Sequence, residues 1–197
     1  MIALASGSTS GQSGAVTLRW RLAKADQPWG DYGDLLTYGM TAHLSRNEAG
    51  ELQLEHTAPF MPAFFLTGIS DVVMTDVVRN DLAASGLIGY ELRRVQLARI
   101  VHLDWRSWDL GADDPVEYPA SGEPEDYILD RPHDEHLAAS VGQIWELVTT
   151  PSRDTSDVDF ANALPKRRYQ LVSDQAAEWI RARFSDWVDL LSWTPDD

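Results

Sequence analysis

Apolar and polar side chains alternate along three separate stretches of the chain. In residues 15–23, AVTLRWRLA, an apolar side chain at every second position alternates with Thr17, Arg19 and Arg21. Residues 51–56, ELQLEH, repeat this pattern briefly, and residues 97–105, LARIVHLDW, carry it through a third stretch. A period of two is typical of a strand with one face in a core and the other in water. The pattern therefore predicts short strands at all three places.

A different period is present in residues 133–148, HDEHLAASVGQIWELV. Its apolar positions begin at Leu137 and recur at spacings of four, seven, eight and eleven residues. This spacing places them along one side of a helix with 3.6 residues per turn. We therefore expect an amphipathic helix over residues 133–148.

Two stretches of the chain echo each other, Val73–Leu92 and Leu171–Leu190. In each, a short apolar run is followed by a hydroxyl residue and Asp76 or Asp174, which are residue types that cap helix N-termini. Both stretches predict strand, cap, helix, turn and strand, with helices near 76–85 and 174–185. A true duplication and a coincidence between two ordinary strand-helix units both remain open.

Short alternating strands with few helices between them predict the fold class. A doubly wound parallel sheet requires regular alternation of strands and helices, and strands that are apolar without interruption. This chain has neither feature. We expect an α+β fold with a largely antiparallel or mixed sheet, a few packed helices, and two loosely repeated strand-helix-strand units.

Length and composition set the domain organisation. The chain has 197 residues, of which 44% are hydrophobic, enough for one core of ordinary size. The Gly/Ser-rich residues 1–14 are expected to form a flexible arm rather than a secretory signal, and residues 15–197 a single domain. The absence of cysteine excludes disulfides, thiolate zinc sites and cysteine nucleophiles, and it favours a cytoplasmic location. No segment is apolar enough to predict a membrane span.

The charge of the chain is strongly negative and unevenly distributed. A formal net charge of −15 argues against nucleic acid as a partner, because phosphate binding requires cations. Residues 104–135 contain eleven acidic residues and only Arg106 and Arg131 as cations, so nine of the excess negative charges lie there. Four prolines and two glycines interrupt any periodicity in this segment. Long irregular segments of this kind are commonly functional or disordered.

Tryptophans lie in and near the acidic segment. Aromatic rings beside carboxylates suit a binding surface, because the rings supply contact area and the acids attract a cationic partner. The alternative is that the rings pack over the edge of the core and the acids form only a solvated loop. We expect a partner-binding surface comprising Trp29, Trp105, Trp108, Asp109, Asp113, Asp114 and Glu117.

Catalytic and metal-binding signatures are weak. His133 and His136 lie one helical turn apart, but the zincin spacing is four residues and the sequence marks no third ligand. Acidic residues at a helix start are also favoured by the helix dipole alone. His102 alternates with strand residues and is expected to be a core or cross-strand histidine. We therefore expect no metal, no cofactor and no enzymatic activity.

Residues 68–105, GISDVVMTDVVRNDLAASGLIGYELRRVQLARIVHLDW, carry a family resemblance. They resemble a pattern of uncharacterised bacterial proteins and of immunity proteins from polymorphic-toxin systems, in which an apolar strand and "TD" precede a helix and "sGltGfef.pV". The chain departs from the pattern at Leu92 and Arg94, where an aromatic residue and a proline are often found. The matching residues are Thr75, Asp76, Leu82, Gly86, Leu87, Gly89, Tyr90 and Val95.

Two functions follow as hypotheses. The resemblance implies a cytoplasmic immunity protein that neutralises a cognate toxin, and the acidic, Trp-bearing segment implies that the toxin domain is cationic. The alternative is a small-molecule-binding protein or small enzyme with a pocket between the two strand-helix units. A continuous acidic surface would favour the first hypothesis, and a deep polar pocket the second.

Overall fold

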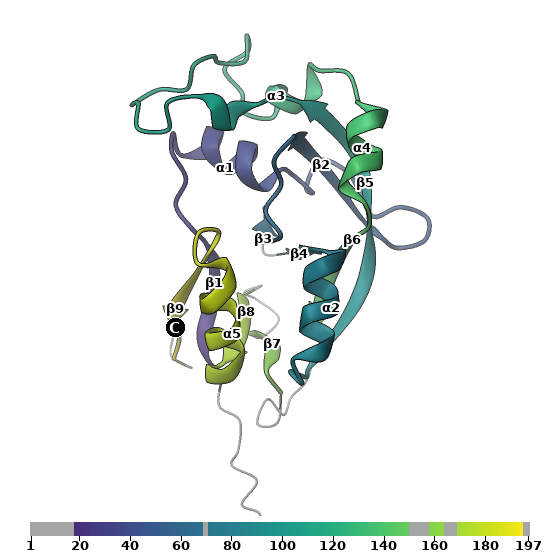
Figure 1. The fold of residues 1–197 in the computed structure, drawn as a ribbon, viewed down its shortest axis with the longest axis vertical. Helices are drawn as coiled ribbons and strands as arrows, with labels where there is room; N and C mark the ends of the chain where they lie inside the picture. The colour runs from purple at the N-terminus through teal and green to yellow at the C-terminus, as the bar shows by residue number, and fades with distance from the viewer. Residues whose placement is uncertain (1–17, 69–70, 150–157, 164–168, 195–197) are drawn as a thin grey trace, which may run out of the picture.

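The computed structural model describes residues 18–68, 71–149, 158–163 and 169–194 (Figure 1). The predicted flexible arm at residues 1–14 lies outside the described residues. The described residues form two sheets with helices packed against them, so the prediction of an α+β fold is confirmed.

One sheet has four strands, and all of its pairs are antiparallel. Helix α5 (Asp174–Phe184) connects the second strand of this sheet to the fourth in spatial order. The predicted strand at residues 15–23 is present from Leu18 onwards as β1, and residues 15–17 lie outside the described residues. The spatial order is β7 (Phe160–Ala163), β8 (Tyr169–Ser173), β1 (Leu18–Lys24) and β9 (Val188–Ser192).

The other sheet has five strands and is mixed. Its first two strands in spatial order are parallel, and its other pairs are antiparallel. Helix α2 (Asp76–Ala84) follows β4 and precedes β5 in the chain. The spatial order is β2 (Leu52–Ala58), β5 (Tyr90–His102), β6 (Ile144–Thr149), β4 (Asp71–Thr75) and β3 (Phe64–Thr67).

The two sheets contain the same arrangement. The segment β3-β4-α2-β5 corresponds to β7-β8-α5-β9, since each consists of a hairpin, a helix and a further strand. In both, a strand from elsewhere in the chain lies between the last two strands: β6 between β4 and β5, and β1 between β8 and β9. The sequence echo at Val73–Leu92 and Leu171–Leu190 therefore marks two units that each receive their middle strand from outside.

Cross-strand registers match between the two units. Trp145 on β6 pairs with Met74 and Arg94, and Trp20 on β1 pairs with Val172 at the corresponding position. The indole nitrogens donate to the first helical residue of each unit, Trp145 Nε1 to Asp76 at 2.9 Å and Trp20 Nε1 to Asp174 at 2.8 Å. A correspondence in register and in hydrogen bonding favours a duplication over a coincidence.

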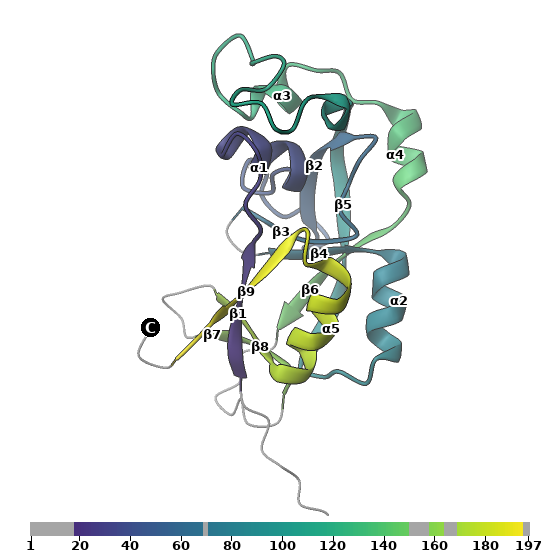
Figure 2. The same ribbon diagram turned by 60° about the vertical axis from the view of Figure 1, so that its left-hand side comes forward.

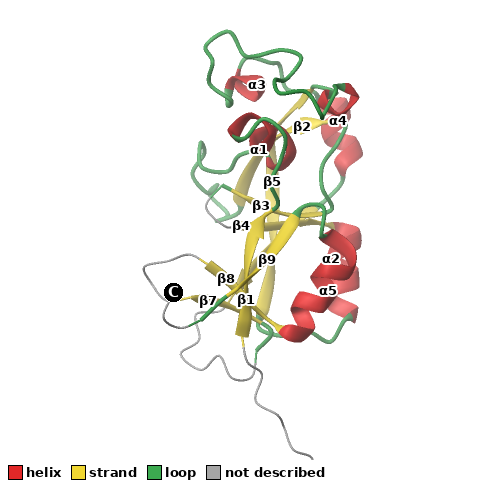
Figure 3. Cartoon of the chain, turned by 90° about the vertical axis from the view of Figure 1, so that its left-hand side faces the viewer, coloured by secondary structure: helices red, strands yellow, loops and turns green. Residues whose placement is uncertain are grey.

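A shared core fills the space between the two units. Helices α2 and α5 lie side by side (Figures 2 and 3), and Arg183 Nε donates to Asp81 Oδ2 across them at 2.9 Å. Phe64 stacks on Phe184 with centroids 4.9 Å apart. The buried members of this core are Leu22, Phe64, Leu66, Val72, Met74, Val78, Leu82, Leu87, Leu147, Phe160, Val172, Ala176, Ala177, Trp179, Ile180, Phe184 and Val188.

The helix predicted over residues 133–148 is wrong in its second half. Helix α4 covers only Glu135–Val141, and the chain then enters β6 at Ile144. Gly142 adopts φ 73°, a conformation that favours glycine and ends the helix. Pairing of β6 with both β4 and β5 outweighs the helical spacing of its apolar residues.

The remaining elements gather at one end of the molecule, the top of Figure 1. They are α1 (Asp31–Tyr38), the 3₁₀ turn η1 (Trp105–Ser107), α3 (Asp126–Leu129) and α4, next to β2 and the second half of β5. A separate core holds them together; its buried members are Leu35, Leu36, Met40, Val101, Leu103, Trp105, Tyr127 and Ile128. We call residues 104–135, which run over α1 at this end, the acidic cap (Figures 1 to 3).

Candidate functional site

Aromatic side chains connect the acidic cap to the segment around α1. Trp105 is only 2% exposed and lies in the core beneath the cap. The ring centroid of Trp108 lies 5.8 Å from that of Trp29 and 6.2 Å from that of buried Tyr127. The ring of Tyr32 on α1 contacts Tyr118 edge to face at 5.0 Å. The cap is thus a packed layer over α1.

Hydrogen bonds to backbone carbonyls fix the cap where it has no regular structure. Trp29 Nε1 donates to Ala112 O at 2.9 Å, and Tyr32 OH donates to Gly122 O at 2.6 Å. The Tyr127 hydroxyl donates to Glu117 O. Trp29 has φ 66°, which is uncommon for a bulky residue and shows that its position is determined by its surroundings.

Several carboxylates of the cap have partners within it. Arg131 pairs with Glu117, and Ser121 Oγ donates to Asp126. Asp134 accepts from the backbone N–H groups of His136 and Leu137, both at 3.0 Å, and caps α4. These backbone bonds lower the pKa of Asp134.

Five other carboxylates of the cap are exposed, and the structure shows no hydrogen bond or ion pair to them from the described residues. An acidic side chain without a cationic neighbour retains its full negative potential. The acidic cap is therefore a surface that is held in a fixed position and carries negative charge without a cationic partner in the part of the chain that the structure describes. These residues are Asp104, Asp113, Glu123, Glu125 and Asp130.

Tyr118 fixes the cap further through its hydroxyl group. It donates to Asp114 Oδ1 at 2.5 Å, and this hydrogen bond raises the pKa of Tyr118 to about 12. The phenol is therefore protonated at neutral pH, and its hydrogen bond engages one oxygen of the Asp114 carboxylate. Asp114 thus supports the shape of the cap, whereas Asp113 beside it is free of such a bond.

The residues predicted for the partner-binding surface come together, but they have different roles. Trp105 is buried and supports the cap from below. Trp29 and Trp108 are half-buried and contact each other, so much of their surface is used in packing. Asp113 is exposed, while Asp109 accepts from Gly111 N at 3.0 Å.

The predicted partner-binding surface did not include the exposed apolar side chains of the cap. Val116 is 69% exposed, Tyr118 49% and Leu110 39%. They lie in an irregular loop, where periodicity gives no signal. Their position among acidic residues is the one feature of the sequence that could have indicated them.

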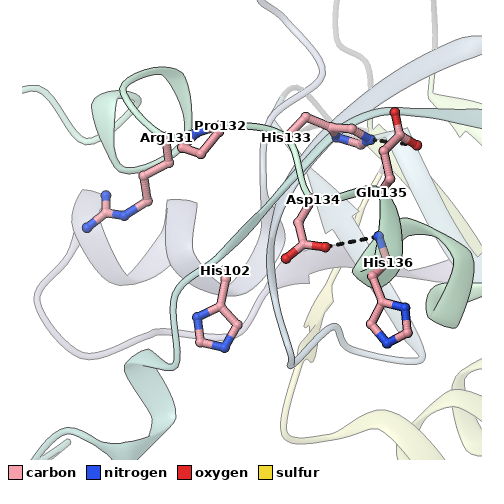
Figure 4. A pocket seen from close by; sticks show the side chains of 7 residues that line it. All are labelled: His102, Arg131, Pro132, His133, Asp134, Glu135 and His136. Atoms are coloured by element: carbon pink, nitrogen blue, oxygen red, sulfur yellow. Dashed lines mark hydrogen bonds and ion pairs between the residues drawn. The ribbon is translucent and has the colours of Figure 1, made fainter.

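A pocket of about 570 Å³ lies at the end of the cap, where β5 and the start of α4 meet (Figure 4). It is lined by His102, Arg131, Pro132, His133, Asp134, Glu135 and His136. His102 was expected to be a core or cross-strand histidine. It is exposed here at the end of β5 and pairs across strands with Ala58, so the cross-strand alternative is the one observed.

The histidines of this pocket are not placed as a metal site. His133 Nδ1 accepts from Ile100 N at 3.0 Å, so the ring proton is on Nε2, which lies 3.6 Å from Glu135. Among the described residues, no three His, Asp or Glu side chains are arranged to share an ion. The pocket can hold a small polar molecule in contact with groups of both charges.

Two buried glutamates of the five-stranded sheet, Glu55 on β2 and Glu146 on β6, bind cationic or histidine side chains. Glu146 is 4% exposed and accepts from both terminal nitrogens of Arg46, at 2.8 and 2.6 Å. Glu55 is 3% exposed and lies 2.7 Å from His43 and 3.4 Å from Arg99. Because Arg46 and His43 belong to the loop between α1 and β2, these two contacts hold the loop against the five-stranded sheet.

Comparisons with protein-family models, with curated proteins and with solved structures found no match to this chain. In the described part of the chain, no helix is long and apolar enough to cross a membrane.

Proposed function

We propose that this protein is a non-enzymatic binding protein of the immunity type, which neutralises a cationic toxin domain through the acidic cap. The single observation that supports this most strongly is the set of five exposed, unpaired carboxylates on a surface fixed by aromatic packing. The resemblance of residues 68–105 to immunity proteins supports the choice of a toxin as the partner.

Physical chemistry favours a cationic partner for this surface. Long-range attraction between opposite charges accelerates the encounter of two proteins, and the acceleration falls as salt screens it. The same surface repels phosphate backbones and anionic lipid. A nuclease toxin presents basic groups to phosphate, so an acidic inhibitor can occupy the same groups.

A second candidate function is small-molecule binding in the pocket lined by His102, His133 and His136. A small-molecule pocket was expected between the two strand-helix units, but the shared core fills that space. The pocket with the three histidines lies elsewhere, at the end of the cap. The pocket is open and lined by both acidic and basic side chains, which suits a small polar or zwitterionic ligand.

The experiment uses three versions of the chain as baits to capture and identify the partner. One is the natural chain, the second carries Asp113→Asn, Glu123→Gln and Glu125→Gln in the cap, and the third is a control. The control carries Glu48→Gln, Glu178→Gln and Asp186→Asn, which are exposed acids outside the cap. Both variants lose three negative charges, and none of the six side chains has a partner among the described residues.

We expect the natural chain and the control to retain one basic protein that the cap variant loses. Inhibition of that protein's toxicity by the natural chain would identify the immunity role. An equal loss of the partner by both variants would show that net charge, and not the cap, determines binding, and full retention by both would show that the cap acids do not determine it. Either result would contradict the proposal.

A further inference from the structure

Exposed large hydrophobic side chains are concentrated in one short loop of the cap. The described residues contain six such side chains, and three of them, Leu110, Val116 and Tyr118, lie within nine residues of one another in sequence. The others are at Val77, Ile88 and Leu191, on other parts of the fold. Scattered exposed apolar residues need no explanation, but a concentration of them indicates a contact surface.

The loop presents these side chains on a fixed backbone. Pro115, next to Val116, is buried. Glu117 is held twice, by Arg131 at its carboxylate and by the Tyr127 hydroxyl at its carbonyl. Val116 therefore lies between two fixed neighbours and still points its side chain into water, with 69% of its surface exposed.

Tyr118 is held in one orientation as well. Its ring packs against Tyr32 and its hydroxyl donates to Asp114, yet about half of its surface, 49%, remains exposed. A side chain that is already ordered loses little conformational entropy when a partner covers it. Ordered, half-exposed tyrosines are common among the residues that dominate binding energy.

Unpaired acids flank the apolar side chains. Asp113 precedes Val116, and Glu123 follows Tyr118. A partner that covers Val116 and Tyr118 must bring cations for these carboxylates, since leaving them unpaired under an interface costs free energy. Charge complementarity therefore selects a segment in which Lys or Arg residues accompany an apolar or aromatic side chain.

Resting on the proposed function, we propose that the partner docks on the cap through an amphipathic cationic segment of protein. Its apolar side chain contacts Val116, Tyr118 and Leu110, and its cations pair with the flanking acids. Trp105 and Trp108 within the cap, and Trp29 in contact with Trp108, hold the shape of the cap. Nucleic acid and anionic lipid do not fit this surface, because their charge has the wrong sign.

The test uses two synthetic peptides of equal length with the same number of Lys and Arg residues. One has Leu and Trp between the cations, and the other has Ser at those positions. Affinities are measured by titration calorimetry on the natural chain and on Val116→Ser, with Val77→Ser on α2 as the control, since Val77 is also exposed (78%).

We expect the natural chain and the Val77→Ser control to bind the amphipathic peptide more tightly than the Ser peptide, by a factor on the order of ten. Val116→Ser should remove most of that preference. Circular dichroism would show that both variants are folded.

Two other outcomes separate this inference from the function it rests on. Equal affinity for both peptides, with a loss in the cap variant that lacks Asp113, Glu123 and Glu125, would overturn the apolar contact and leave the acidic surface in place. Equal affinity of both peptides for the natural chain and for that cap variant would overturn the apolar contact and the acidic binding surface together.

Discussion

His56 is a buried titratable side chain whose protonation is linked to the stability of the fold. It is fully buried on β2, with Nδ1 2.5 Å from Thr57 O and Nε2 3.1 Å from Thr37 O. Burial lowers the pKa of His56, although both carbonyl oxygens favour the protonated ring. The folded protein therefore holds a neutral imidazole that can donate to only one of the two carbonyls.

This burial predicts a loss of stability in weak acid. The unfolded chain protonates His56 near its ordinary pKa of about 6.5, and the folded chain does so only at lower pH. The contribution is fully present above that value and decreases as pH falls, because the unfolded state then binds more protons. Urea unfolding between pH 8 and pH 5 should show a decreasing free energy of unfolding.

The control for this prediction is His56→Gln, which has no titratable group at the site. Its overall stability should be lower, and its unfolding free energy should vary less with pH than that of the natural chain. The other four histidines are unchanged in this variant. An equal pH slope in both proteins would show that His56 is not responsible.

At the scale of secondary-structure elements, Trp145 and Trp20 show how each helix is attached to its sheet. In both units a tryptophan on the inserted middle strand donates to an aspartate in the first turn of the helix. An arginine of the same helix lies over the ring, Arg79 at 4.7 Å from the Trp145 centroid and Arg181 at 5.2 Å from that of Trp20. Each contact therefore connects a strand from outside the unit to the unit's own helix.

Replacement of either tryptophan by phenylalanine should have a similar effect on stability. Trp145→Phe and Trp20→Phe remove the indole N–H and leave an aromatic ring, so each should lower the free energy of unfolding by about 1 kcal/mol. Urea titrations of the two variants and of the double variant test this. A large loss in one variant with none in the other would contradict the equivalence of the two units.

Elements were predicted well where local signals and tertiary pairing agree. The helices predicted near 76–85 and 174–185 are present as α2 and α5. The predicted cap forms only at α5, where the Ser173 side chain accepts from Ala176 N, and Thr75 makes no such bond at α2. The helix predicted over 133–148 was wrong from Ile144 onwards. The apolar residues there are spaced for a helix, but they also fit a strand that pairs with a neighbouring strand along each edge. Helix α1 was not predicted, because it follows Gly30, which has no side chain that could indicate a cap in the sequence.

The whole molecule consists of a repeated framework and an added end. The two units share one core, and elements without a counterpart in the C-terminal unit form the other end, which contains the acidic cap and the histidine pocket. The sequence predicted the acidic segment and its tryptophans from composition alone. It could not predict which acids are paired, because those contacts depend on how an irregular segment folds back on itself. The burial of Trp105 was also not predicted, because Trp105 packs in a core with residues of α1 and α3.

The most direct test of the central claim is the rate at which the captured partner associates with the three versions of the chain at low and high salt. Stopped-flow fluorescence should show that the cap variant with Asp113→Asn, Glu123→Gln and Glu125→Gln associates about tenfold more slowly at low salt. The charge-matched control should associate at close to the natural rate, and the difference should shrink at high salt. Equal association rates for all three proteins at both salt concentrations would contradict a role for the acidic cap in partner binding.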